Sequence, residues 1–289
     1  MLRNCGHKVS VTLEWDGKPV DALFALHARR SHPSILRYHH AHPEGKLVVV
    51  LTGTDLYRDI RFDAGAQQSI ELAKRLVVLQ DQGLKELARR HRAKTSVVYQ
   101  SAQVPARMAT SGKIFRVCVV GHLREEKDPF RPALALRLIP PADAIELIHV
   151  GKALSPDMSA QVKSLAAAEP RYRWLGGLPH WHTLRWLCRS QLMVISSRME
   201  GGANVIAEAA RAGIPVLASD IPGNIGMLGI DYPGYFRFGD ERALAGLLIK
   251  SMRHYAFYQS LRRGIAARRH LFQPQSEQAS LVRLLRQLA

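Results

Sequence analysis

Short runs of apolar and β-branched residues alternate with helical stretches along the chain. Residues 47–51 form one of the longest of these runs, and glycine or polar residues close most of them. Short strands that alternate with helices are typical of βα units around a parallel sheet rather than of a sandwich. In the first part of the chain, the pattern predicts strands at residues 9–15, 22–26, 47–52, 75–79 and 96–99.

Pro105, Ser111 and Gly112 interrupt this pattern and mark a domain boundary. Beyond them the alternation resumes, and strands are predicted at residues 115–121, 145–151, 173–175, 192–196, 216–219 and 235–238. Residues from 240 onward have a helical pattern. We therefore predict an N-terminal α/β domain over residues 1–110, a second over residues 111–270, and a C-terminal helix over residues 271–289 that could pack back on the first domain.

The composition is that of a folded protein rather than a disordered or membrane-spanning one. Of the 289 residues, 47% are hydrophobic and 22% are charged, which is ordinary for globular proteins. The apolar runs are far shorter than the ~20 residues that a membrane-spanning helix needs, and the start resembles no secretory signal. We expect a cytoplasmic protein without a membrane span.

Basic residues outnumber acidic ones, with 41 Lys and Arg against 24 Asp and Glu and a formal net charge of +17. This balance favours an acidic partner, which could be nucleic acid, an anionic membrane surface or a small phosphorylated substrate. No recognised nucleic-acid motif accompanies the charge, so we expect no specific nucleic acid. The histidines at 32, 39, 40 and 42 lack a cysteine or paired carboxylates that would complete a metal site, so we predict no metal and no other cofactor.

Several predicted strands end directly in glycine or in small polar residues. Examples are Thr52-Gly53-Thr54-Asp55, Val120-Gly121-His122 and Ile195-Ser196-Ser197. The carboxyl ends of the strands in an open α/β sheet face the ligand crevice. The loops after these strands are therefore the places where we expect the chemistry.

Residues 196–216 are the most informative stretch, with the order strand, loop, helix, turn, strand. Gly201 and Gly202 let backbone N–H groups approach an anion closely, and the helix predicted to begin near Ala203 directs its positive end to the same place. Glu200 lies in this loop and Glu208 lies about two turns along the helix, so the two carboxylates could contact different hydroxyl groups of one extended ligand. By spacing alone, a structural interpretation is equally good: Glu200 could be an acidic residue that favours the start of a helix, and Glu208 a solvated helix position.

With its surroundings, this stretch resembles the retaining glycosyltransferases of the GT-B fold. The likeness lies in two glutamates separated by seven residues, the glycines after the first, and the segment Ala212-Gly213-Ile214-Pro215-Val216. Residues 120–129 also resemble the element in which the family's Arg and Lys neutralise the diphosphate. Lys127 matches, whereas His122 stands in the place of the arginine, so Arg124 is our substitute candidate; without the resemblance, both cations would be read as a solvated loop.

The resemblance implies an α/β fold with two Rossmann-like domains facing a cleft. It assigns the donor sugar to Glu200 and the loop amides, the ribose to Glu208, and the vicinity of the base to residues 174–179. The donor-binding residues that it implies are Gly121, His122, Leu178, Gly201, Gly202, Ala203, Asn204 and Glu208. The catalytic residues that we predict are Glu200, Lys127, Arg124 and His27.

Further motifs make the chain similar to a narrower family, the selenosugar synthases of selenoneine biosynthesis. They are residues 26–31, 51–59, 121–124, 196–204, 221–224 and 231–236. The resemblance implies transfer of a sugar from a UDP-sugar, such as UDP-N-acetylglucosamine, to selenophosphate, which gives a 1-seleno-sugar with a carbon–selenium bond, UDP and phosphate. Relatives begin about one βα unit earlier, so we expect an N-terminally shortened chain whose first domain lacks its first strand.

Selenophosphate is already anionic, and selenium is a soft nucleophile, so a cationic cradle is needed more than a strong base. As its acceptor-binding residues we predict Arg29, Arg30, Thr52, Gly53, Thr54, Asp55 and Arg58, around His27. Arg30 and Arg58 could equally be surface cations, and Asp55 could simply cap a helix. A conventional transferase with a hydroxyl acceptor, or a nucleotide-sugar-binding protein without turnover, remains as an alternative. The preferred sugar, the anomeric configuration and the oligomeric state stay open.

Overall fold

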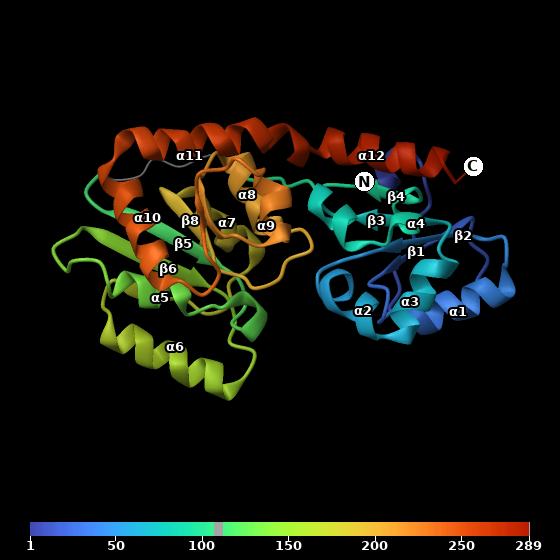
Figure 1. The fold of residues 1–289 in the computed structure, drawn as a ribbon, viewed down its shortest axis with the longest axis horizontal. Helices are drawn as coiled ribbons and strands as arrows, with labels where there is room; N and C mark the ends of the chain where they lie inside the picture. Colours follow the sequence, from blue (N-terminus) through green and yellow to red (C-terminus); the bar gives the residue numbers. More distant parts are fainter. Residues whose placement is uncertain (107–111, 289) are drawn as a thin grey trace. The chain divides into compact units, whose positions relative to one another are not determined.

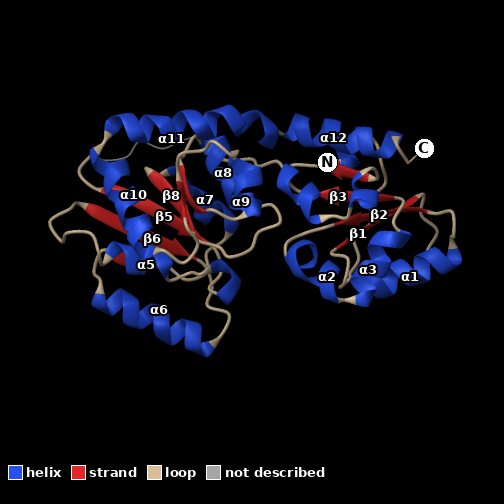
Figure 2. Ribbon diagram, in the orientation of Figure 1, coloured by secondary structure: helices blue, strands red, loops and turns tan. Residues whose placement is uncertain are grey.

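The computed structural model describes residues 1–106 and 112–288, and the chain divides into two compact units. The first unit comprises Met1–Ser101, Met199–Ala203 and Gln273–Ala289, and the second comprises Ala102–Arg198 and Asn204–Phe272. In each unit, parallel strands form the centre and helices surround them (Figure 2). The boundary predicted at residue 110 lies outside the described residues.

The sheet of the first unit has four parallel strands in the order β1-β2-β3-β4 among the described residues. The strands are β1 (Ala22–Leu26), β2 (Lys46–Val50), β3 (Arg75–Val78) and β4 (Thr95–Val97). The helices are α1 (His32–Ala41), α2 (Ile60–Phe62), α3 (Ala64–Leu72), α4 (Arg89–Arg92) and α12 (Pro274–Arg286), with a π-helical turn over Asp55–Asp59. All four strands lie where the sequence predicts them.

Both faces of this first sheet are apolar, because successive side chains of a strand point to opposite faces. Leu47 and Val49 of β2 pack in a core with Ile35 and Tyr38 of α1. Val48, between them, packs on the other face in a cluster that includes Leu284 of α12. The last helix therefore covers β3 and β4 (Figure 1) and completes the core of the unit that contains the beginning of the chain.

The strand predicted at residues 9–15 is absent, so this prediction was wrong. Val11 and Leu13 are fully exposed, with 85% and 105% of their surface accessible. An alternating pattern specifies a strand only where a neighbouring strand and a core receive it. Trp15 instead packs edge-on against Tyr38, with ring centroids 5.3 Å apart, and so anchors an irregular segment to α1.

Over the described part of the second unit, the sheet has six parallel strands in the order β10-β9-β8-β5-β6-β7. The strands are β5 (Phe115–Val120), β6 (Ile145–Val150), β7 (Tyr172–Trp174), β8 (Leu192–Ile195), β9 (Val216–Ser219) and β10 (Tyr235–Phe236). The helices are α5 (Arg131–Leu136), α6 (Pro156–Ala168), α7 (His180–Cys188), α8 (Asn204–Ala212), α9 (Pro222–Leu228), α10 (Glu241–Arg253) and α11 (Tyr255–Arg268).

The order of these strands reverses in the middle of the sheet. From β5 the chain continues through β6 and β7 on one side, and it then returns to β8, β9 and β10 on the other. Helices α5 and α10 pack on each other, and α8 packs on both α7 and α9 (Figure 1). At such a reversal the loops after the two central strands diverge and leave a crevice at their carboxyl ends. Here these are the loops after β5 and β8.

No described helix is both long enough and apolar enough to cross a bilayer. Within the described ranges, no three His, Cys, Asp or Glu side chains gather in a way that could hold a metal ion.

Candidate functional site

Hydrogen bonds tie together the loops after β5 and β8. The Ser196 hydroxyl, just after β8, donates to the carbonyl oxygens of Lys127 and Asp128 at 3.2 and 2.8 Å. The Arg198 N–H donates to the Glu126 carbonyl at 2.8 Å. Lys127 is half-buried and lies beside Gly121, where an added Cβ would be 3.9 Å from its Cδ. Two predicted site residues, Gly121 and Lys127, thus lie in a loop that is hydrogen-bonded to residues 196 and 198, directly after β8.

A buried histidine, His149, is hydrogen-bonded to the backbone carbonyl of Gly121. His149 of β6 is 1% exposed; its Nε2–H donates to the Gly121 carbonyl at 3.3 Å, and its Nδ1 accepts from the Tyr172 hydroxyl at 2.9 Å. Burial lowers the pKa of His149 to about 4, so this imidazole is neutral at neutral pH. No motif in the sequence points to His149, although a lone histidine inside an apolar strand is a usable signal.

The other predicted residues of this loop lie at the surface. His122 and Arg124 are exposed, and His122 Nδ1 accepts a hydrogen bond from the Lys152 N–H at 3.1 Å. The stem of Lys152 lies across Gly177, where a Cβ would come within 2.2 Å of Lys152 Cγ. Lys152 also lines a cavity of about 530 Å³ that follows β6 and β7. Leu178 is half-buried in the loop after β7. Lys152, in the loop after β6, is a further cation near this site that no motif in the sequence indicated.

Glu208 lies on α8 and is paired with a histidine of α7. It is only 9% exposed, while Asn204 at the start of α8 is exposed. His180 Nε2 donates to Glu208 Oε1 at 2.8 Å. Burial raises the pKa of Glu208, and the bond to His180 opposes that rise. Glu208 is therefore not a solvated helix position. No motif in the sequence indicated His180 as its partner.

The loop Met199–Ala203 groups with the first unit. Glu200 is buried there, and so are Gly201 and Ala203. A Cβ added to Gly201 would lie 1.8 Å from the Thr52 carbonyl oxygen, and one added to Gly202 would lie 2.5 Å from Leu79 Cβ. Contacts this short exclude any side chain, so the two glycines are required for the close approach of this loop to its neighbours.

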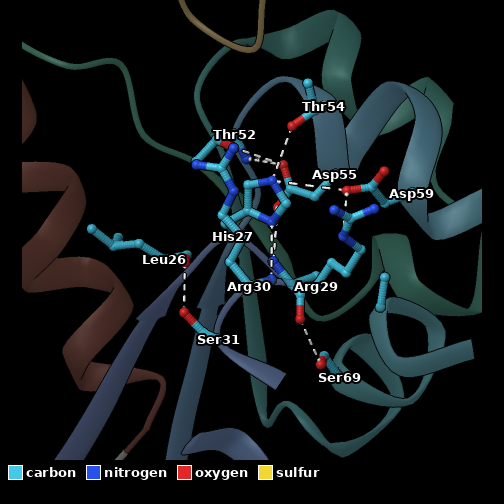
Figure 3. A network of polar contacts seen from close by, with 12 residues as sticks. Leu26, His27, Arg29, Arg30, Ser31, Thr52, Thr54, Asp55, Asp59 and Ser69 are labelled. Carbon is cyan, nitrogen blue, oxygen red and sulfur yellow. Dashed lines mark hydrogen bonds and ion pairs between the residues drawn. The ribbon is translucent and has the colours of Figure 1, made fainter. Parts of the chain in front are cut away.

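His27 lies at the end of β1, in the middle of a polar network (Figure 3). It adopts a left-handed φ of 74°, which is rare for a residue with a side chain, and it is 7% exposed. Its Nδ1 accepts from the Arg30 N–H at 3.3 Å, and its Nε2–H donates to the Thr54 hydroxyl at 2.9 Å. Burial lowers the pKa of His27; Asp55 and Asp59 oppose this effect, whereas Arg30 and Arg29 add to it.

Asp55 ties the loops after β1 and β2 together. Its side chain is completely buried and accepts three hydrogen bonds, from the Ala28 N–H at 2.9 Å and from the Thr52 N–H and hydroxyl at 2.8 Å each. Capping of the following helix is not its role, because no described bond runs from its carboxylate into that helix. The carboxylate is a clamp between two strand ends, and it also lies 3.9 Å from His27 Nδ1.

Asp59 organises two of the three arginines that we predicted for the acceptor cradle, Arg29 and Arg58. One turn of π-helix separates it from Asp55. Its Oδ1 accepts from Arg58 Nε at 2.9 Å, and its Oδ2 lies 3.6 Å from Arg29 Nε. This Oδ2 is buried without a hydrogen-bond partner among the described residues. Arg29 and Arg58 are half exposed, at 49% and 51%. Arg30 is exposed, and its backbone N–H donates a hydrogen bond to His27 Nδ1. Gly53 is half-buried beside Thr52.

The comparisons with known proteins agree with this fold. Residues 114–254, just under half of the chain, match the family described as glycosyl transferases group 1. No curated protein matches the chain. Among solved structures, HepE from Anabaena in complex with UDP and glucose has a TM-score of 0.74 at 17% identity, covering 92% of this chain and 78% of that one.

Two synthases are similar to the same extent. Sucrose-phosphate synthase from Thermosynechococcus elongatus has a TM-score of 0.75 at 16% identity, covering 93% of this chain and 73% of that one. The α,α-trehalose 6-phosphate synthase from Burkholderia multivorans has a TM-score of 0.74 at 12% identity, covering 93% and 72%. Residues 114–254 are thus similar to the glycosyl transferases group 1 family, and the chain has the α/β fold of GT-B glycosyltransferases with two Rossmann-like domains.

Proposed function

We propose that the protein transfers the sugar of a UDP-sugar, such as UDP-N-acetylglucosamine, to selenophosphate. The observation that carries the donor half of this proposal is the junction of the loops after β5 and β8, where Lys127 lies beside Gly121. The junction sits at the reversal point of the sheet, which is the ligand crevice of open α/β folds. HepE, which has a similar fold, was crystallised with UDP-glucose.

The leaving group of this reaction is UDP, so negative charge develops on the diphosphate in the transition state. Lys127 would stabilise that charge more in the transition state than in the ground state. Glu208 would accept hydrogen bonds from the ribose hydroxyls. Glu200 would hold the sugar.

The acceptor half rests on the resemblance to selenosugar synthases and on the cationic network at the end of β1. Arg29 and Arg58 expose about half of their side chains while Asp59 holds them, which suits a bound anion. Selenium would form a bond to the anomeric carbon as the bond from that carbon to the UDP oxygen breaks, and the electron pair leaves with UDP. Water would then take the phosphoryl group, which cleaves the phosphorus–selenium bond and frees phosphate.

The decisive experiment is mass spectrometry of the products formed from UDP-N-acetylglucosamine or UDP-glucose with selenophosphate, against a panel of alcohol acceptors. We expect a 1-seleno-sugar and UDP. Arg29→Ala should raise the KM for selenophosphate at least several-fold, because one charge-assisted contact is lost, whereas Arg90→Ala, a paired surface arginine of the same unit, should not. UDP release only with alcohols would refute the selenium acceptor.

The donor assignments have their own test. Glu208→Ala should weaken UDP binding in calorimetry, whereas Glu200→Ala should mainly slow sugar transfer. If both variants behave identically, the assignment is wrong.

One observation favours a hydroxyl acceptor as the second candidate. Burial lowers the pKa of His27 even though Asp55 and Asp59 lie 3.9 and 3.8 Å from its ring nitrogens. A neutral histidine can accept the proton of an alcohol once one of its ring nitrogens gives up its present hydrogen bond. The product analysis separates the two acceptors. UDP binding without any product would instead identify a nucleotide-sugar-binding protein.

A further inference from the structure

We propose that His180 is a positioning residue of the nucleotide site, which orients the Glu208 carboxylate toward the ribose hydroxyls. The proposal rests on the proposed function, in which Glu208 binds the ribose. Nothing in the sequence motifs points to His180; the geometry of the second unit does.

The contact itself is well placed for this role. His180 is the first residue of α7, directly after Pro179, and α7 packs on α8. The imidazole reaches Glu208 Oε1 at 2.8 Å from the solvent side, since 70% of the His180 side chain is exposed against 12% for Glu208. A carboxylate has about four lone-pair sites. One bond to His180 therefore fixes the orientation of the group and leaves acceptor sites for a diol.

Two opposing effects set the protonation of Glu208. Burial favours its neutral form, and the His180 N–H favours the ionised form, which is the form that can accept from two hydroxyl groups. Among the described residues, His180 is the one charged or titratable neighbour that acts on the Glu208 pKa. The other charged or titratable groups on α8 and on the elements packed against it are Arg211, His182, Arg185, Cys188, Tyr255, Tyr258, Arg262, Arg263, Arg268, Arg269 and His270.

Removal of His180 should therefore make UDP binding more sensitive to acid. Without the donor, the pKa of Glu208 rises, and the ionised fraction falls at a higher pH than in the wild type. We expect His180→Ala to bind UDP within about threefold of the wild type at pH 8 and about tenfold more weakly at pH 5.5, because the ionised fraction of Glu208 is then smaller. The ratio of the two affinities at each pH cancels the titration of UDP itself.

The experiment is isothermal titration calorimetry of UDP at pH 8.0, 6.5 and 5.5. His180→Gln keeps an N–H donor and should bind within about threefold of the wild type at every pH. In a Glu208→Gln background, which cannot ionise, His180→Ala should have no pH-dependent effect. His254→Ala, an exposed histidine of the same unit, is the matched control, and thermal unfolding checks that each variant is folded.

The outcomes separate this inference from the function on which it rests. If the wild type binds no UDP, the proposed function fails. If the wild type binds UDP and Glu208→Gln weakens binding, while the loss caused by His180→Ala is absent or equal at all three pH values, the role of His180 is refuted and the donor site stands.

Discussion

Replacement of His149 by glutamine should make the second unit more resistant to acid. His149 is buried in β6, and both ring nitrogens are hydrogen-bonded, one to Tyr172 and one to the Gly121 carbonyl. Because burial lowers its pKa to about 4, the folded protein resists protonation of this ring, whereas the unfolded chain binds a proton near pH 6.5. Glutamine offers a donor and an acceptor without titrating.

The sign and size of the effect follow from proton linkage. Below pH 6.5 the unfolded state binds more protons than the native state, so the free energy of unfolding falls as the pH falls toward 4. With the pKa displaced from 6.5 to about 4, this residue alone should remove about 2 kcal/mol of stability between pH 7 and pH 5. His149→Gln should lose that much less over the same interval.

Urea unfolding at pH 7 and pH 5, followed by tryptophan fluorescence, measures the difference. Trp174, Trp181 and Trp186 lie in the second unit and Trp15 in the first, so most of the signal reports on the unit that contains His149. His254→Gln removes an exposed histidine of that unit and should change the pH dependence little. The reasoning fails if His149→Gln and the wild type lose equal stability between the two pH values at unchanged m-values.

Three further predictions concern packing and burial. Asp55→Asn should cost about 3 kcal/mol in thermal unfolding, because one amide oxygen cannot replace a carboxylate that accepts three buried hydrogen bonds; an unchanged Tm would contradict the clamp. Gly151→Ala should cost about 1–3 kcal/mol, since its methyl would meet the carbonyl of the turn after β5 at 1.8 Å, whereas Gly246→Ala, with open space around it in α10, should stabilise by about 1 kcal/mol. Burial raises the pKa of Cys118 to about 12, so neither Cys118 nor buried Cys188 should react with a maleimide until urea unfolds the protein, and mass spectrometry showing rapid native labelling of either would refute this.

The apolar pattern predicted the strands well because burial enforces it. In β2, Leu47 and Val49 must face one core and Val48 the other, so a run of apolar residues is unavoidable there. Residues 9–15 show the same kind of pattern without a partner strand, and Val11 and Leu13 are exposed. A pattern in one segment carries no information about whether a neighbour exists to receive it.

The residues of the candidate site also differ in how far the sequence can predict them. Gly201 and Gly202 could be predicted from a motif because the backbone there approaches its neighbours too closely for any side chain. His180 and Asp59 could not, since each acquires its role from one partner brought by another element: Glu208 of α8 for His180, and Arg29 beyond β1 for Asp59. A single charged or polar residue in the sequence looks the same with or without such a partner.

The state of His27 bears on which acceptor the first unit can serve. Its Nδ1 lone pair is occupied by the Arg30 N–H, and its Nε2 carries the proton that bonds to Thr54. In this arrangement neither ring nitrogen has a lone pair ready for the proton of an alcohol. A hydroxyl acceptor would require the ring to leave the Arg30 N–H or to exchange tautomers, at the cost of a buried hydrogen bond. An acceptor that arrives deprotonated needs neither change, so the resting hydrogen bonds favour an anionic nucleophile over a neutral one.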